Sequence, residues 1–277
     1  MKTAEVAQLW GMMVYEFKMH WRRRALLIIV LAIFFMTTVS VLLIGGNLPV
    51  ALNLPGASAN GSASQQVMNF AVVFITWAPI GVTLAFVLPI AVADTIPLDR
   101  QRGVSELLNS LPLSPATYLT GKLFGMWSAC VIGISAILLL VGTVWWLRVG
   151  SFDLSPYVTM WLFGAVAQIV LCGSVGVLIA AGQPSRRRAI VAAVVLLAIA
   201  FNFGGFQAGS LITYLSPMRA PILAYFLSNP SMGSLGLANQ FGFEFQDVLV
   251  TIGFGLGEIV LLWLAVWFWM RRREAGL

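Results

Sequence analysis

Six long apolar stretches dominate the pattern of hydrophobic and polar positions along the chain. Each is long enough for a helix to cross the hydrocarbon core of a membrane, which takes about 20 residues. The pattern therefore predicts an all-α polytopic membrane protein whose 277 residues form a single transmembrane domain. The predicted spans are approximately 25–46, 67–93, 123–147, 158–182, 189–206 and 248–270.

An amphipathic segment, 3–21, precedes the first span. Its apolar residues recur at helical spacing, and most of its charged residues lie on other faces. We expect an interfacial helix that lies along the membrane surface and is anchored by Trp21 and the arginines after it. A helix packed on a partner is the less favoured alternative, because no soluble domain is evident for it to pack on. The apolar stripe consists of Val6, Leu9, Trp10, Met13 and Phe17.

Two segments between the spans differ in character. Residues 47–66 are rich in Gly, Ser, Ala and Asn and contain prolines, so we expect a flexible loop. Residues 207–247 are also interrupted by Pro and Gly, yet they are rich in Leu, Ile, Phe and Tyr. Such a segment is too interrupted to span and too apolar for water, so we predict short outer-leaflet helices packed on their neighbours.

The basic residues set the orientation of the predicted spans. The chain is 60% hydrophobic and 9% charged, with a formal net charge of +6. Lys and Arg lie in short blocks beside the apolar runs, and only Arg148 and Arg219 fall on the opposite side of the membrane. The positive-inside rule, with an even number of spans, then places both termini in the cytoplasm. We expect the protein in a cell membrane, namely a prokaryotic plasma or inner membrane. Because the positions of Lys and Arg beside the apolar runs account for the net positive charge, no nucleic-acid partner is expected.

Cysteine and histidine are too few to indicate a disulfide framework or a metal site. Cys130 and Cys172 both lie inside apolar runs, where we expect small buried hydrophobic side chains. His20 is the only histidine, so the chain has too few histidines for a typical zinc site and only one candidate base for a catalytic triad.

The stretch "DRQRGVSELLNSLPLSP", which joins the second and third spans, carries an apolar stripe of its own. We predict a short cytoplasmic helix over 99–112, stopped by Pro112, followed by a new helix with Ser114 as its N-cap. The stripe could face lipid or a protein cleft. The mixed charges beside it favour a cleft, because lipid-lying helices are usually more uniformly basic. The stripe residues, at helical spacing, are Val104, Leu107, Leu108 and Leu111.

The longer stretch "DRQRGVSELLNSLPLSPATYLTGK", 99–122, resembles the coupling-helix region of ABC-2-type transporter permeases. The shared pattern is an acidic–Arg pair, a basic–Gly pair, a Glu followed by leucines, a Pro, a small residue, and a Gly–Lys pair that opens the next span. Asp99 stands where Glu is more usual in that family, and Val104 where Thr is common. The resemblance covers the whole chain, since the family also has an amphipathic helix, six spans and outer-leaflet helices between the last two.

The resemblance implies the permease subunit of an exporter, a half-transporter that pairs with a second copy or a homologous permease. A separate cytosolic ATP-binding subunit would bind ATP and Mg and power export of a hydrophobic, amphiphilic or lipid-linked substrate. The sequence contains no G-x-x-x-x-G-K-[ST] motif, so we expect no enzymatic activity and no cofactor in this chain. By resemblance, the ATP-binding subunit docks on Asp99, Arg100, Arg102, Gly103, Val104, Glu106, Leu107, Leu108 and Leu111, with a second contact at the N-terminal helix.

Two other functions are compatible with the pattern. A mechanotransmission subunit would have the same architecture but would relay the ATPase stroke to an extracytoplasmic protein without translocating cargo. A membrane-embedded enzyme is less favoured, because the chain has one histidine and scattered acidic residues.

Polar residues within the spans are functional candidates, because a carboxylate inside a membrane costs a few kcal/mol. Glu258, Asp94 and Gln168 are the candidates. For Glu258 we favour a carboxyl group that ties helices together, with Gln168 or Asn202 as its partner. No ring of charges lines the spans, which argues against selection of a small ion.

Two G-x-x-x-G pairs allow helices to approach closely, namely Gly121/Gly125 and Gly253/Gly257. We expect them to serve packing within the chain rather than a seam between two permeases.

Overall fold

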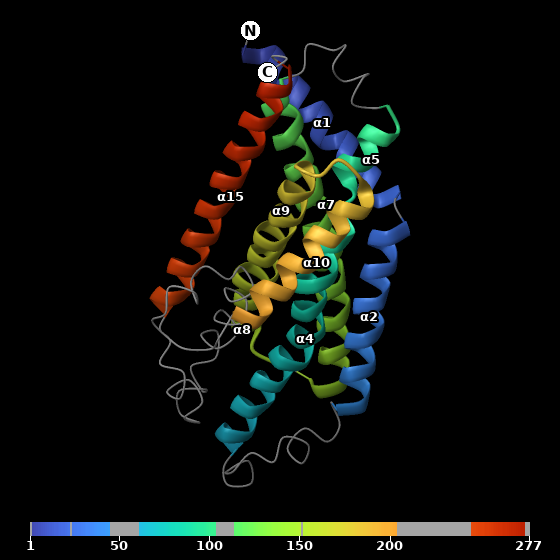
Figure 1. Ribbon diagram of the computed structural model, residues 1–277. Helices are drawn as coiled ribbons and strands as arrows, with labels where there is room; N and C mark the ends of the chain where they lie inside the picture. The colour runs from blue at the N-terminus through green and yellow to red at the C-terminus, as the bar shows by residue number, and fades with distance from the viewer. Residues whose placement is uncertain are drawn as a thin grey trace.

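The computed structural model describes residues 2–22, 24–44, 61–103, 114–150, 152–203 and 245–274, and its regular structure is helical throughout these ranges (Figure 1). The predicted all-α class is therefore confirmed for the part of the chain described. The helices are α1 (Lys2–Arg22), α2 (Arg24–Ile44), α4 (Gly61–Val92), α5 (Thr95–Gln101), α7 (Pro115–Val149), α8 (Leu154–Thr159), the π-helix η1 (Met160–Val166), α9 (Ala167–Ala181), α10 (Arg186–Phe203) and α15 (Phe245–Glu274).

Several helices are long and apolar enough to cross a membrane. Within the described ranges there are four such stretches, and a fifth if α1 and α2 form one span bent by 59°. Six spans therefore stay a prediction, as does a crossing by 189–206, although α10 is helical over most of that range. Of the predicted segments 47–66 and 207–247, residues 47–60 and 207–244 lie outside the described residues. Residues 61–66 belong to α4, so the prediction of a flexible loop is wrong there, and residues 245–247 begin α15. The four stretches are Ile75–Gln101, Pro115–Arg148, Tyr157–Ala181 and Ile252–Arg272.

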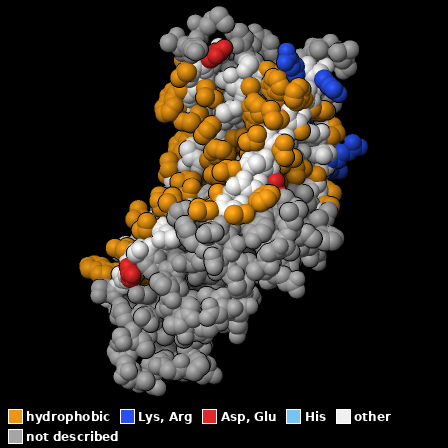
Figure 2. All heavy atoms as spheres, turned by 90° about the vertical axis from the view of Figure 1, so that its left-hand side faces the viewer, with side chains coloured by type: hydrophobic (Ala, Val, Ile, Leu, Met, Phe, Trp, Pro, Cys, Tyr) orange, Lys and Arg blue, Asp and Glu red, His pale blue; other side chains and the backbone are white. Residues whose placement is uncertain are grey.

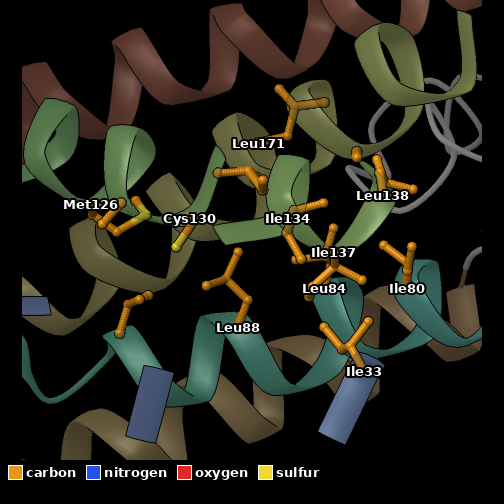
Figure 3. Close-up of a cluster of buried hydrophobic side chains, with 14 of the residues drawn as sticks. Ile33, Ile80, Leu84, Leu88, Met126, Cys130, Ile134, Ile137, Leu138 and Leu171 are labelled. Carbon is orange, nitrogen blue, oxygen red and sulfur yellow. The ribbon is translucent and has the colours of Figure 1, made fainter. Parts of the chain in front are cut away.

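The core lies where α2, α4, α7 and α9 meet (Figure 3). Between helices in lipid there is little hydrophobic driving force, so close van der Waals packing holds such a core together. Both cysteines are buried and neither forms a disulfide, which confirms the expectation that they are buried side chains of the core. Core side chains that are at most 3% exposed include Ile33, Ile80, Leu84, Leu88, Met126, Cys130, Ile134, Ile137, Leu138 and Leu171.

The start of α7 follows the sequence prediction. Ser114 is the N-cap, its hydroxyl accepts a hydrogen bond from the Thr117 N–H at 3.1 Å, and Pro115 occupies the first helical position. This cap is a local interaction, so it could be predicted from neighbouring residues alone.

Two glycines bring α1 against the first turns of α7. A Cβ atom at Gly121 would lie 2.6 Å from Met12 Cγ, and one at Gly125 would lie 2.5 Å from Glu16 Cβ. Met12, Glu16 and His20, spaced four residues apart, are buried on the facing side of α1. The Gly121/Gly125 pair therefore serves packing within the chain, as predicted.

The apolar stripe predicted for α1 is not its packing face. Val6 and Trp10 are 66% and 63% exposed, whereas the face of Met12 and Glu16 is buried. The two faces lie roughly a quarter-turn apart around the helix. α1 packs on α7 of the same chain, which neither alternative anticipated. An interfacial position for α1 is compatible with the exposed stripe and stays a prediction.

The second glycine pair, on α15, is not used for packing within the described chain. A Cβ atom at Gly255 would lie 2.6 Å from Leu171 Cδ2, so this intervening glycine is the one that faces α9. A Cβ atom at Gly253 or Gly257 would have no described atom within 4 Å. No described residue packs on this pair, so its use for packing within the chain stays a prediction. Figure 2 shows the side of the molecule on which α15 lies, covered largely by hydrophobic side chains.

We predict opposite effects for alanine in the two glycine pairs. Gly125→Ala should lower the melting temperature, because overpacking of this kind costs about 1–3 kcal/mol. Gly257→Ala should leave it unchanged or slightly raised, because alanine favours helix and the position is open. Thermal unfolding of both variants in the same detergent checks this, and equal melting temperatures would contradict the α1–α7 contact.

Candidate functional site

Several helix ends converge at one end of the bundle, which we call the basic end. Figure 1 shows α1, α5 and the first turns of α7 there, together with the end of α9 and the C-terminal end of α15. Exposed arginines of α10 and α15 also lie here, namely Arg186, Arg187, Arg188, Arg271 and Arg272. The segment 104–113, which carries the resemblance to coupling helices, leaves and re-enters the described structure at this end.

The predicted helix over 99–112 does not begin at Asp99. Asp99 and Arg100 belong to the last turns of α5, which follows α4 after a short turn and ends at Gln101. Gly103 then adopts a φ of +70°, a left-handed conformation in which glycine commonly terminates a helix. The boundary is therefore corrected: α5 stops before Gly103. Val104, Glu106, Leu107, Leu108 and Leu111 lie outside the described residues.

A buried lysine forms the centre of the basic end. Lys122 Nζ of α7 lies 2.7 Å from Glu16 Oε1 of α1 and 2.6 Å from Asp99 Oδ2 of α5. All three side chains are at most 3% exposed. We call these residues, with Tyr118, the Lys122 cluster. Ion pairs that hold three helices together in this way fix their relative positions.

Tyr118 completes the cluster. Its hydroxyl donates a hydrogen bond to Asp99 Oδ2 at 3.0 Å, and Lys122 Nζ lies 5.3 Å from the centre of its ring. Tyr118 and Lys122 are neighbours on α7 because residues four apart share a helix face. Asp99 therefore has a hydroxyl and an ammonium group as partners, and its carboxylate faces the protein interior.

Arg100 connects α5 to two further helices. Its guanidinium donates hydrogen bonds to the carbonyl oxygens of Ala181, at 2.8 Å, and Gln183, at 3.0 Å. These carbonyls follow the end of α9, where a helix lacks partners for its last C=O groups and favours a positive charge. The guanidinium also lies 5.2 Å from the ring centre of Trp269 in α15. Arg100 thus binds the ends of α9 and α15 to α5.

Asp94, a predicted intramembrane candidate, lies in the turn between α4 and α5. Its Oδ2 pairs with Arg186 Nη2 of α10 at 3.0 Å. The Arg186 side chain is 54% exposed, so this pair lies near the surface. Its position and partner explain Asp94 as a link between α10 and the turn.

The other two intramembrane candidates are not brought together. Gln168 of α9 donates from Nε2 to the Gly81 carbonyl of α4 at 3.0 Å, and it is buried. Glu258 lies partly buried on α15, with no hydrogen bond or ion pair to any described residue. The predicted tie between Glu258 and Gln168 is therefore wrong, and the side chain of Asn202 lies outside the described residues.

Of the predicted docking residues, Arg102 is exposed, whereas Asp99 and Arg100 make the intrachain contacts above. Sequence reasoning missed the pairing of Glu16 with Lys122. The available signal was that Gly121, Lys122 and Gly125 sit together on α7 while Glu16 is the one acidic residue in the second half of α1. Among the residues that the structure describes, no group of three or more His, Cys, Asp or Glu side chains is placed to hold a metal ion.

Loss of the central lysine should destabilise the protein far more than loss of a surface arginine. Lys122→Met leaves two buried carboxylates without their cation, and breaking a buried ion pair in this way costs about 3–5 kcal/mol. Arg186→Met removes a half-exposed partner of Asp94 and should cost less than about 1 kcal/mol.

Equilibrium unfolding of both variants in detergent measures this difference. Protease cleavage between α1 and α2 should also increase in Lys122→Met, because α1 loses an anchor. Equal stability of the two variants would show that the cluster does not hold α1 in place.

No protein-family model matches the chain, and no curated protein matches it. What the chain does is therefore inferred from its own residues and their contacts.

Proposed function

We propose that this chain is the membrane-spanning permease subunit of an ABC transporter, driven by a separate ATP-binding subunit. The resemblance of 99–122 to ABC-2 coupling regions supports this proposal, as do the helices long and apolar enough to cross a membrane. The single observation that carries it is the attachment of the segment 104–113 to the basic end. Both of its ends lead directly into residues that join several helices.

The attachment on the N-terminal side runs through α5. Asp99 pairs with Lys122, and Arg100 binds the ends of α9 and α15. The attachment on the C-terminal side runs through α7, where Tyr118 and Lys122 belong to the same cluster. A displacement of 104–113 therefore acts on α1, α7, α9 and α15 together. This is the mechanical property that a coupling segment needs.

In the proposed complex, the apolar stripe of Leu107, Leu108 and Leu111 docks in a cleft of the ATP-binding subunit. Arg102, exposed at the end of α5, lies at the edge of this contact with Glu106 as its acidic counterpart. Asp99 and Arg100 transmit the stroke from inside the permease instead of touching the partner. This differs from the expectation that all nine residues contact the ATP-binding subunit.

The proposed cargo is hydrophobic, amphiphilic or lipid-linked. The buried charges at the basic end pair with one another, so they do not present a charged lining to a small ion. A second copy of the chain or a homologous permease completes the transport pathway, and ATP and Mg bind to the partner subunit.

We expect an ATP-binding subunit to copurify with the protein from its native membrane in mild detergent. Leu107→Asp/Leu108→Asp should abolish this association, because charged side chains cannot occupy an apolar cleft without a large desolvation cost. Mass spectrometry of the eluate, with the subunit ratio quantified, is the measurement.

Pro184→Asp is the matched control, since it adds a carboxylate at an exposed position of the basic end outside the segment. It should retain the ATP-binding subunit. If no ATPase copurifies at any detergent strength, the permease proposal fails. Capture of an extracytoplasmic protein, together with ATPase activity that substrates do not stimulate, would indicate mechanotransmission instead.

Glu106→Arg should separate ATP hydrolysis from transport. The variant should insert into the membrane normally, because residue 106 lies outside the apolar runs. Reversal of the charge at the docking contact should reduce coupling by at least tenfold, measured as substrate transported per ATP hydrolysed in proteoliposomes. Unchanged coupling would remove Glu106 from the docking surface.

A further inference from the structure

An apolar groove lies between the second half of α7 and the segment formed by α8 and η1, toward the end of α7 opposite the basic end. It has a volume of about 650 Å³, within the range of about 300–1,000 Å³ that is usual for small-molecule sites. Leu139, Gly142 and Trp146 line it from α7, and Leu154 and Val158 line it from α8.

Apart from the indole N–H of Trp146, the polar side-chain groups on the wall of the groove already donate hydrogen bonds within the chain. The Tyr157 hydroxyl donates to the Leu138 carbonyl at 2.7 Å, and the Thr143 hydroxyl donates to the Leu139 carbonyl at 2.8 Å. Each of these donors is therefore already used within the chain.

Trp161 and Ser135 satisfy each other in the same way. Trp161 Nε1 donates to Ser135 Oγ at 3.0 Å, and Ser135 Oγ donates to the Val131 carbonyl at 2.6 Å. Trp161 belongs to η1, and π-helical segments are frequent at functional sites. Because the donors of Tyr157, Thr143, Trp161 and Ser135 are bonded within the chain, the surface of the groove is mostly carbon.

Water is a poor occupant for such a groove. An ordered water molecule needs two to four polar partners, and apolar cavities without them stay dry. A ligand that must be recognised through several hydrogen bonds is disfavoured for the same reason. A hydrocarbon chain loses nothing by entering, and it replaces empty space with van der Waals contacts.

The groove opens toward the side of the bundle that faces lipid when α7 crosses the membrane. Leu139 is 74% exposed, and Trp146, Leu154 and Val158 are also exposed. Trp146 and Phe152 lie near the end of α7, at the depth where aromatic side chains mark the membrane interface. An acyl chain can therefore enter from the bilayer without crossing the protein.

We propose that this groove binds one acyl chain of a membrane phospholipid that enters from the bilayer. The occupant is a bilayer lipid, not a second protein or another part of this chain. The site does not depend on an ATP-binding subunit, so it can be tested separately from the permease proposal.

The test uses the full-length protein in vesicles of phosphatidylethanolamine and phosphatidylglycerol that contain a phosphatidylglycerol with a diazirine on one acyl chain. After photolysis, mass spectrometry of peptides locates the lipid adducts. We expect adducts concentrated on Leu139, Trp146, Leu154 and Val158, at least fivefold above those on Leu140. Leu140 is exposed on the same helix but does not line the groove.

Variants test the shape of the site. Leu139→Trp should fill the groove and reduce these adducts at least fivefold, whereas Leu140→Trp should not.

Three outcomes would overturn the proposal. One is even labelling of Leu139 and Leu140 in the unaltered protein, a measurement that requires no variant to fold. The second is an adduct pattern that Leu139→Trp leaves unchanged. The third is protection of the whole groove from the probe, which would mean that protein already fills it.

Discussion

The buried charge of Lys122 is the constraint on which the arrangement of helices at the basic end depends. An ammonium group in a low-dielectric interior is tolerated only beside compensating anions, and Glu16 and Asp99 supply them from two different helices. A shift of α1 or α5 away from α7 would leave at least one of these ions unpaired. The cluster therefore adds little net stability compared with apolar packing, yet it excludes alternative registers of the three helices.

This constraint could not be met without the glycines that flank it. Glu16 reaches Lys122 because Gly121 and Gly125 remove the side chains that would hold α1 away from α7. Lys122, Gly121 and Gly125 lie on one side of α7. The residues of α1 that face this side are the ones that become buried. The stripe that looked most apolar was left exposed, because burial on α1 is decided by the charge and by the space on α7.

Helix positions and caps were therefore predictable from the sequence, whereas contacts between helices were not. The apolar runs identified the helices, and Ser114 with Pro115 identified the start of α7, because each depends on neighbours along the chain. The end of α5 at Gln101 was missed because the stripe begins only at Val104 and so carries no information on the residues before Gly103. Asp99 and Arg100 could be singled out from the sequence by their resemblance to a motif. Their partners, Lys122 and the end of α9, are evident only in the folded structure.

The two ends of the molecule are linked through α7. This helix has no proline beyond its first position, so it has none of the proline kinks that interrupt α4 at Pro79 and Pro89. Lys122 and Leu139 are separated along it by roughly 25 Å. The opposite wall of the groove is η1, which runs directly into α9, and the end of α9 is bound by Arg100. Both walls of the groove thus lead back to α5 by separate routes, one through Lys122 and one through Arg100. In the proposed permease, a force that separated these two attachments would be transmitted along α7 and α9 toward the groove.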